Sequence, residues 1–294
     1  MSELTGNDLR MYKLALYTAK YYQFDFNKSY QDNVLGVIET LKQNPTGLIT
    51  SLTVKTYYYL LEALQNGKAE KYAKNEFYAD DFDLLISLNV IDIRNNAINP
   101  IYQDIIASFI NAPITKSFAY LVSLIKGMVD TYGIIEVKKA DAILSNFIKE
   151  SKYNVEYVVR NSSLLSAFMV IENGVIYHRV LDENQRTQII NFRKKHLTDD
   201  FKMKMFKGTD YIAFASTYRM DEIRPYLPSA WFDEVFKDKR FNLELYSVKH
   251  LHESGIISDN VANKLEEIHK YYPKWALNGY SIQEYYDHDN KKVA

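Results

Sequence analysis

The chain has 294 residues, with 36 Lys or Arg against 37 Asp or Glu, so its net charge is −1 at pH 7. This balance counts against a nucleic-acid-binding protein, which usually carries a basic excess. Cysteine is absent, which excludes disulfides, thiol nucleophiles and cysteine-ligated metals. The N-terminus is polar, and the longest apolar run, 167–171, is far shorter than the ~20 residues of a membrane span. We therefore expect a cytoplasmic protein with no membrane contact.

The N-terminal part contains two predicted helices. Apolar side chains recur at helical spacing over residues 9–23, which indicates an amphipathic helix. A shorter helix is predicted for residues 34–41. It ends near Asn44-Pro45, because a residue before proline is disfavoured in the helical region.

Residues 48–102 are predicted to form a helix, a second helix and a β-hairpin. Apolar positions over 57–64 repeat at i, i+3, i+4 and i+7, and Gly67 supplies the C-cap. Asp80 or Asp81 begins the next helix. Residues 94–96, Arg-Asn-Asn, join two short strands, since asparagine tolerates positive φ.

Residues 118–181 repeat this order with clearer signals. A stripe from Phe118 to Val129 predicts a long helix, and helices over 140–148 and 154–163 follow. Strands over 167–171 and 175–181 are joined by Asn173-Gly174, the strongest short-range hairpin signal in the chain. We therefore expect an α+β fold that is mainly helical, with tandem winged-helix-like units of helix, helix and hairpin.

The rest of the chain is predicted to be a helical C-terminal region interrupted by Pro225 and Pro228. Ser281 and Glu284 have the spacing of a capping box. The expected domains are residues 1–115, with the N-terminal helices and the first winged-helix-like unit, 116–183, with the second unit, and 184–294, the helical region.

Two short motifs resemble patterns found in other proteins. Residues 275–281 read Trp-Ala-Leu-Asn-Gly-Tyr-Ser and are followed by Glu284, and residues 132–135 read Tyr-Gly-Ile-Ile. The first resembles a C-terminal W-x-L-N-G-x-(T/S)-x-x-E pattern in a loose group of uncharacterised cytoplasmic proteins of low-GC bacteria. The second is similar to a mid-chain Y-G-I-(I/V) turn of that group. The resemblance implies a shared layout and no activity. From the residues alone, Trp275 is expected to anchor the terminal turn against the core.

The common catalytic signatures are missing from the sequence. The closest glycines, Gly127 and Gly133, lie six positions apart, a spacing that fits neither the dinucleotide-binding motif nor the P-loop. The G-x-S-x-G and H-E-x-x-H motifs are also missing. We therefore expect a protein that is not an enzyme and has no cofactor.

A metal-dependent enzyme remains an alternative. His250, His252 and His269 are the best metal candidates, but helical positions i and i+2 point ~200° apart, so solvated or capping histidines are the favoured interpretation. The aspartates of 80–83 suit Mg²⁺, yet they equally suit the negative start of a helix, which we favour.

The most basic region lies in residues 186–207. Its candidate phosphate contacts for a DNA-binding regulator are Arg186, Arg193, Lys194, Lys195, Lys202 and Lys204. An amphipathic helix pair with a solvated basic face is the alternative, which we favour. In the second winged-helix-like unit, residues 153–163 hold Arg160 as their one firm cation, a weak set for reading guanines.

Tyrosine gives the strongest positive signal. The chain has 25 tyrosines, many of them adjacent, as in 21–22, 57–59, 271–272 and 285–286. Three consecutive helical residues sweep ~200°, which is wider than the ~100° core-facing stripe of an amphipathic helix. Some of these rings must then meet solvent, another part of the chain or a partner. The expected partner-binding residues are Tyr22, Tyr58, Tyr59 and Tyr272.

These patterns favour a non-catalytic protein-binding regulator or inhibitor that forms homo-oligomers and acts through tyrosine-rich surfaces. The preference for Lys over Arg, with many Asn, Ile and Tyr, is typical of AT-rich genomes and suggests a low-GC bacterium or its phages and mobile elements. The alternatives are a DNA-binding transcriptional regulator that uses the winged-helix units, and the metal-dependent enzyme.

Overall fold

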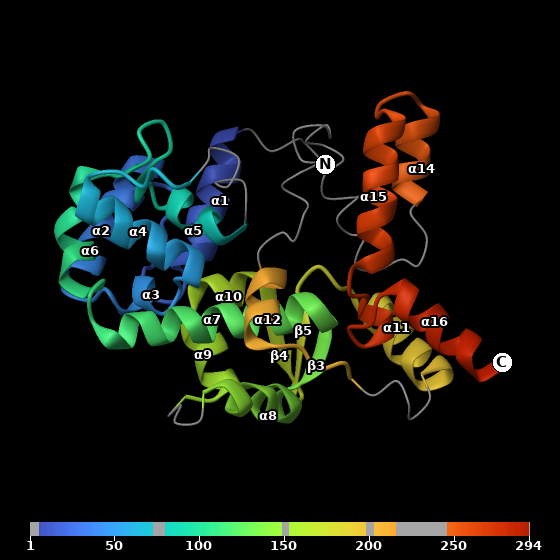
Figure 1. Ribbon diagram of the computed structural model, residues 1–294. Coiled ribbons are helices and arrows are strands. Elements are labelled where there is room, and N and C mark those ends of the chain that lie inside the picture. The colour runs from blue at the N-terminus through green and yellow to red at the C-terminus, as the bar shows by residue number, and fades with distance from the viewer. Residues whose placement is uncertain (1–5, 73–79, 149–152, 198–202, 216–245, 294) are drawn as a thin grey trace. The chain divides into compact units, whose positions relative to one another are not determined.

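A computed structural model describes residues 6–72, 80–148, 153–197, 203–215 and 246–293. The fold is mainly helical with two small sheets, as predicted. The chain divides into two compact units (Figure 1). Unit 1 comprises residues 1–126 and 136–179, and unit 2 comprises residues 127–135 and 180–294.

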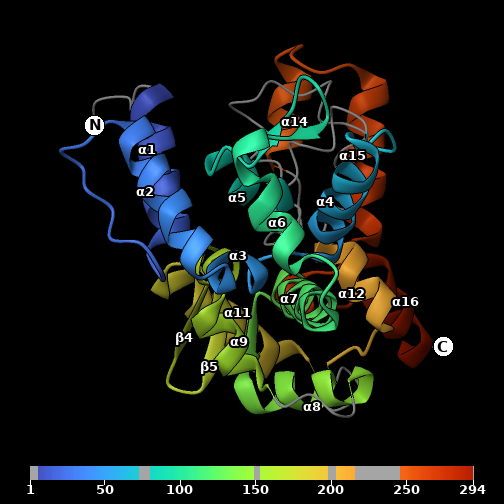
Figure 2. The ribbon, with the colours of Figure 1, turned by 90° about the vertical axis from the view of Figure 1, so that its left-hand side faces the viewer.

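Unit 1 begins with helices and a short hairpin. Its elements up to residue 109 are α1 (Gly6–Thr18), α2 (Tyr30–Gln43), α3 (Thr46–Ile49), α4 (Val54–Asn66), α5 (Asp80–Ser87), β1 (Ile91–Asp92), β2 (Ala97–Ile98), η2 (Pro100–Tyr102) and α6 (Gln103–Phe109). Strands β1 and β2 are antiparallel, with Ile91 opposite Ile98. Helix α4 packs against α5, α6 and β2 (Figure 2).

The long helix α7 (Pro113–Tyr132) contributes residues to both units. It leads into β3 (Ile134–Glu136), α8 (Val137–Phe147), α9 (Val155–Asn161), α10 (Ser163–Phe168), β4 (Met169–Glu172) and β5 (Val175–His178). The three-stranded sheet has the order β3-β5-β4. Strands β4 and β5 form an antiparallel hairpin in which Met169 lies opposite His178.

Unit 2 is helical after β3. Its further described elements are α11 (Glu183–His196), α12 (Gly208–Ala215), α14 (Tyr246–Glu253), α15 (Asp259–Tyr271), η6 (Trp275–Leu277) and α16 (Ile282–Val293). Helix α15 packs against α14 and α16, and α11 packs against η6 (Figure 1).

The predicted helix ends are confirmed where the sequence carries a cap. Helix α2 stops at Asn44, just before Pro45, and α4 ends at Gly67 with a φ of 75°. Asn173 and Gly174 both have positive φ, which matches the tight turn that their pairing predicts. The helix-helix-hairpin order of residues 48–102 is also present, as α4, α5 and β1–β2.

The strand predicted for 167–171 begins two residues late, at Met169. Ser162 ends α9 and caps a new helix, α10, by accepting a hydrogen bond from the Leu165 N–H. That cap keeps Ala167 and Phe168 helical. Helix α9 therefore corresponds to the helix predicted for 154–163, and α10 is a short helix that the sequence did not predict. The breaks predicted at Pro225 and Pro228 lie outside the described residues.

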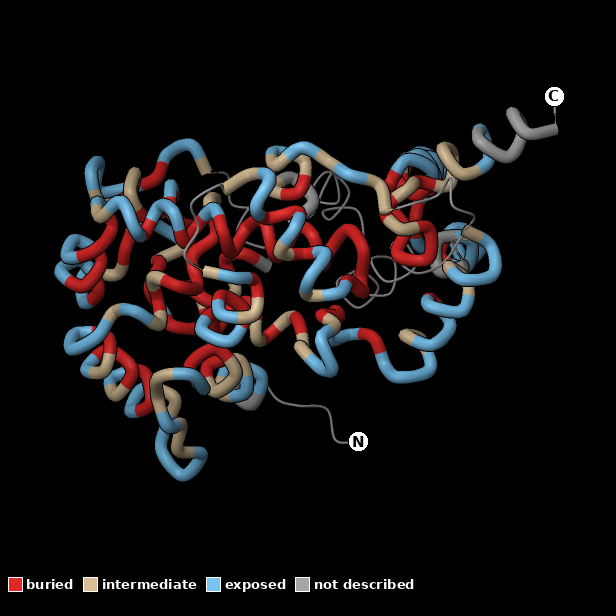
Figure 3. The backbone as a smooth tube through the Cα atoms, turned by 90° about the horizontal axis from the view of Figure 1, so that it is seen from below, coloured by how far each residue is buried: buried red, intermediate tan, exposed pale blue. Residues whose placement is uncertain are grey.

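The second half of α7 and the residues that follow it are buried. Every residue from Leu121 to Ile135 is buried, including the polar Ser123, Lys126 and Asp130. Figure 3 colours the backbone by burial. A helix surrounded on all sides must bury its polar positions as well as its apolar stripe. Within the described ranges no single helix is both long and apolar enough to cross a membrane. Residues 100–109 and 113–132 meet that test only as a pair, which is bent by 99°.

Candidate functional site

The candidate site is a group of three exposed residues on unit 1, Tyr58, Lys116 and Tyr120, which we call the tyrosine patch. Tyr58 is 38% exposed and Tyr120 is 36% exposed, and Lys116 is also exposed. The Lys116 ammonium lies 5.9 Å from the centroid of the Tyr58 ring. A hydrogen bond to the Tyr58 hydroxyl raises the pKa of Lys116, so the ammonium stays charged at neutral pH. Burial, followed by a hydrogen bond to Tyr58, raises the pKa of Tyr120.

Helical geometry explains why these side chains point outward. On α4, Tyr57 and Leu60 are buried, so Tyr58 is rotated away from the core-facing stripe. On α7, Lys116 and Tyr120 lie four residues apart and therefore share one face of the helix. Phe118, between them in the sequence, is buried on another face. The patch thus joins exposed faces of two helices.

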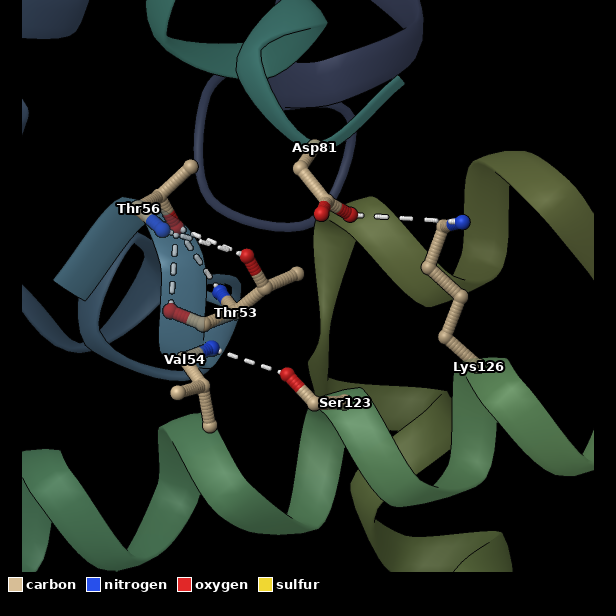
Figure 4. Close-up of polar contacts among 6 residues, drawn as sticks. All are labelled: Thr53, Val54, Thr56, Asp81, Ser123 and Lys126. Atoms are coloured by element: carbon tan, nitrogen blue, oxygen red, sulfur yellow. Dashed lines mark hydrogen bonds and ion pairs between the residues drawn. The ribbon is translucent and has the colours of Figure 1, made fainter. Parts of the chain in front are cut away.

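Buried polar contacts fix the start of α4 on α7 (Figure 4). The backbone N–H of Val54 donates to Ser123 Oγ over 2.8 Å, and the Ser123 side chain comes from α7. Thr53 and Thr56 form a reciprocal capping box that holds the first turn of α4. The helices that carry the patch are therefore joined by directed hydrogen bonds in addition to apolar packing.

A buried ion pair fixes α5 on the same helix. Lys126 Nζ of α7 lies 3.9 Å from Asp81 Oδ1 at the start of α5, and their side chains are 2% and 4% exposed (Figure 4). The Lys126 ammonium also lies 5.5 Å from the centroid of the Phe168 ring. Separating two such buried charges is costly, so this pair specifies how α5 and α7 meet. Because the pair is closed to solvent, it cannot reach a substrate.

The structure separates the four tyrosines expected at a partner surface. Tyr58 is exposed, as predicted, whereas Tyr22 is half-buried and its hydroxyl lies 3.3 Å from Asn33 Oδ1. The expectation that Tyr59 and Tyr272 lie at the surface is wrong, since they are 0% and 1% exposed. The Tyr59 ring packs edge-on against Tyr72 and Phe82, at centroid distances of 5.2 and 5.3 Å.

A second tyrosine cluster lies inside unit 2. The hydroxyls of Tyr132 and Tyr211 are 2.6 Å apart, and Tyr132 donates to the Lys204 carbonyl over 2.5 Å. Since Tyr132 has one proton, Tyr211 donates to Tyr132. Burial, with the neighbouring Tyr211, raises the pKa of Tyr132 far above its ordinary value. Both phenols stay neutral, so we call this pair the buried tyrosine pair.

The two motif segments meet beside this pair. The Trp275 indole N–H donates to the Asp130 carbonyl over 2.9 Å. A side chain on Gly133, which has a φ of 68°, would place its Cβ 2.4 Å from the Trp275 ring. The anchoring role expected for Trp275 is therefore confirmed, and Gly133 is the residue that lets the ring approach. Ser281 and Glu284 also form the predicted capping box, with Ser281 N–H donating to the carboxylate over 2.8 Å.

Arg193 connects the same segments. Its guanidinium donates to the carbonyl oxygens of Tyr132, Ile134 and Trp275. Burial lowers the pKa of Arg193 to about 10, which leaves the group protonated at neutral pH. All of these acceptors are backbone atoms, so the expectation that Arg193 contacts phosphate is wrong: its donors are used inside unit 2.

The other basic candidates lie in different surroundings. Lys194 and Lys195 are exposed on α11, and Arg186 is half-buried and donates to the Leu181 carbonyl over 3.2 Å. Lys204 forms an ion pair with Glu284, so this cation is also engaged within the chain. Lys202 lies outside the described residues. Of these candidate residues, Lys194 and Lys195 lie on a solvent-exposed face, as the favoured interpretation of the sequence predicts.

The three candidate metal-binding histidines do not converge. His250 and His252 are exposed on α14, and His252 Nε2 lies 2.7 Å from Asp259 Oδ1. His269 is buried, and its Nδ1 lies 2.6 Å from Lys274 Nζ. Within the described ranges, no group of three or more His, Asp or Glu side chains is arranged to hold a metal ion.

Sequence reasoning missed Lys116 and Tyr120. Their spacing of four residues on a helix was a usable signal, because it places a cation and a ring on one face. The sequence could not indicate that this face lies beside Tyr58, because Tyr58 is about 60 residues earlier in the chain. Comparisons with family models, curated proteins and solved structures found no match to this chain.

Proposed function

We propose that this chain is a non-catalytic protein-binding regulator or inhibitor, encoded by a phage or mobile element, that acts through the tyrosine patch. The observation that carries the proposal is the exposure of Tyr58, Lys116 and Tyr120 together on two helices that are fixed to each other. Tyrosine suits a protein interface because its large rigid ring loses little entropy and its hydroxyl tolerates water. Lys116 adds a charge that selects an acidic partner surface.

The buried ionisable groups support a role without catalysis. Lys126 and Asp81 are closed to solvent in unit 1. Lys274 is 0% exposed and contacts His269, which is 7% exposed, in unit 2. A catalytic amine or imidazole must reach its substrate, and these four side chains do not. Their contacts instead fix helices and turns.

Affinity capture from host-cell extract, followed by mass spectrometry, tests the proposal. The full chain is compared with the double variant Tyr58→Ala/Tyr120→Ala. The matched control is Tyr271→Ala, which removes a tyrosine that is 55% exposed on α15. We expect one captured protein to be lost with the double variant and kept with the control. The proposal fails if the captured proteins are the same for all three chains, or if purified partner binds the double variant with unchanged affinity.

We also propose that the chain forms homo-oligomers. The support is the same patch, because a second copy supplies acidic side chains and rings as readily as a foreign partner. Light scattering coupled to size exclusion measures the mass directly. We expect a mass above that of one chain, and the double variant should lower it if the patch forms the contact. A single-chain mass over a wide concentration range would overturn this part of the proposal.

A DNA-binding regulator is the second candidate, because the order of elements favours it. Helices α8 and α9 are followed, after the short α10, by the β4–β5 hairpin, the helix-helix-hairpin order of a winged-helix unit. Exposed Lys194 and Lys195 on α11 are suited to contact phosphates. Against it, Arg160 on α9 is engaged by Glu156, with 2.7 Å between the charged atoms.

A mobility-shift assay separates the two candidates. Duplexes of mixed sequence are titrated at low salt, where phosphate contacts are strongest. DNA binding predicts a shift that weakens with added salt and with Lys194→Ala/Lys195→Ala, while Tyr58→Ala/Tyr120→Ala leaves it unchanged. If no duplex shifts at low salt, the DNA-binding candidate is wrong.

A further inference from the structure

A groove on unit 1, separate from the tyrosine patch, has the properties of a binding site for a helix. Its volume is about 1150 Å³. It is lined by residues of α1 and α2, of α5, of the β1–β2 hairpin and of 99–101. Figure 2 shows where α1, α2 and α5 lie. This volume equals that of a helix about 10 Å across over a length of ~15 Å, which is about ten residues or three turns. The groove is larger than most small-molecule pockets, which hold roughly 300–1,000 Å³.

The lips of the groove are apolar. Leu9 of α1, Leu35 of α2 and Ile101 of η2 are 47%, 52% and 43% exposed. The buried side chains of Ile38 and Ile91 also line the groove. Three exposed aliphatic side chains from separate elements around one groove mark an interaction site more strongly than scattered ones do.

The groove also has fixed polar groups. The Tyr30 hydroxyl donates to the Ser87 carbonyl over 2.9 Å, which ties α2 to the end of α5. Lys13 of α1 and Asp83 of α5 form an ion pair at 2.8 Å. The first contact joins α2 to α5 and the second joins α1 to α5. The elements that line the groove are therefore fixed to one another, and binding needs little reorganisation.

The charged side chains that line the groove leave one positive charge in excess, since Arg10, Lys13 and Arg94 face two carboxylates. Lys13 pairs with Asp83. Hydrogen bonds from the Asn95 side chain and the Arg94 N–H lower the pKa of Asp92, and the charge of Arg94 also helps to lower it. The guanidinium groups of Arg10 and Arg94 are exposed, and neither forms an ion pair with a described residue. A guanidinium fork fits a carboxylate with two parallel hydrogen bonds, so the complementary groups on a partner are Asp or Glu.

We infer that this groove binds an amphipathic helix of a partner protein, with aliphatic side chains at i, i+3 or i+4, and i+7, and with carboxylates beside that stripe. The aliphatic stripe packs between Leu9, Leu35 and Ile101. The carboxylates meet Arg10 and Arg94 at the rim. This is the helix-in-groove mode of recognition, in which the apolar face supplies affinity and the flanking charges supply selectivity. The inference stands apart from the tyrosine patch, so either can fail alone.

A displayed pool of 15-residue peptides tests the inference. Each peptide has Leu or Ile at i, i+3 or i+4, and i+7, and every other position is varied among Glu, Lys, Gln and Ala. The full chain is the immobilised bait. We expect enrichment of peptides with Glu in place of Lys beside the stripe. Selected peptides should lose about tenfold or more in affinity towards Leu35→Glu, which places a charge on the apolar lip, and much less towards Leu35→Ala.

A charge exchange makes the test specific. With Arg10→Glu/Arg94→Glu as bait, the preference should reverse from Glu to Lys at the same positions. Tyr58→Ala/Tyr120→Ala should select the same peptides as the natural chain. The inference is overturned if no sequence is enriched, if Leu35→Glu selects the same peptides, or if the charge exchange leaves the preference unchanged. It is also overturned if light scattering shows a dimer that Leu35→Glu dissociates, because the groove is then occupied by a second copy.

Discussion

The two tyrosine clusters differ in what their hydroxyl groups contact. In the buried pair of unit 2, Tyr132 and Tyr211 bond to each other and to the Lys204 carbonyl. In the patch of unit 1, Tyr58 and Tyr120 contact each other and Lys116, and the rings stay partly exposed. A phenol is buried where a backbone carbonyl accepts its hydrogen bond, and it remains at the surface where its partners are solvated. Tyrosine content alone therefore says little about surface area available for binding.

The largest expected effect is at Arg193, which holds the segments beside the buried pair. Arg193→Met should lower the free energy of unfolding by about 3 kcal/mol, because it leaves three carbonyl groups without their donor. Urea denaturation followed by circular dichroism measures the change. Lys194→Met, one residue along on the exposed side of α11, should stay within about 0.5 kcal/mol of the natural chain. Equal stability of the two variants would show that Arg193 does not connect these segments.

The next largest effect compares the loss of one tyrosine hydroxyl in each of the two clusters. Tyr132→Phe keeps the ring and removes the hydroxyl, so the Lys204 carbonyl and the Tyr211 hydroxyl both lose a partner. We expect a loss of about 1–2 kcal/mol in the free energy of unfolding. Tyr120→Phe makes the same chemical change in the patch and should cost less than about 0.5 kcal/mol. If the two substitutions cost the same, the contrast between buried and exposed hydroxyls is wrong.

Local signals predicted the parts of the fold that depend on neighbours in sequence. The ends of α2 and α4 follow from Pro45 and Gly67, and the β4–β5 turn follows from Asn173-Gly174. In each case one residue type fixes the backbone conformation without help from the rest of the chain.

The site could not be predicted in the same way, because its contacts join distant residues. Periodicity left Tyr59 off the stripe, but Tyr72 and Phe82 cover it from elsewhere in the chain. Arg193 lies in the most basic stretch of the sequence, yet its acceptors are carbonyl groups about 60 and 82 residues away. Charge and ring counts describe a residue's own chemistry, whereas burial depends on which segments reach it.

A smaller effect concerns pH and unit 2. Burial raises the pKa of Glu284, but hydrogen bonds from Lys204 and Ser281 outweigh it, so the net pKa is lowered from its ordinary value of 4.5. A lowered folded-state pKa contributes stability above the unfolded value, and that stability is lost as pH falls through the folded value. Glu284→Gln should cost about 1 kcal/mol at pH 7. The difference should shrink as the pH falls below the unfolded value of 4.5 and through the lowered folded value.

The control for that experiment is Glu266→Gln on α15, where the carboxylate is exposed. Its stability should match that of the natural chain throughout the pH series. Urea midpoints measured from pH 3 to pH 8 give both curves. A stability difference between Glu284→Gln and the natural chain that is as large at pH 3 as at pH 7 would show that the carboxylate charge is not what stabilises the start of α16.

The smallest expected change in stability is in the patch itself, and it sharpens the comparison most. Tyr58→Phe should alter the free energy of unfolding by less than about 0.5 kcal/mol, since water replaces the lost contact. The same substitution should move the pKa of Lys116 down towards its ordinary value of 10.5, because the hydrogen bond to Tyr58 is what raises it. Titration by NMR of the Lys116 side chain measures that shift.

Lys68 is the internal control, because its pKa is raised by Glu70 in the same unit and should not move. A Lys116 pKa that stays raised would mean that the three patch residues do not act together, and the surface on which the proposed function rests would be two separate rings and a lysine.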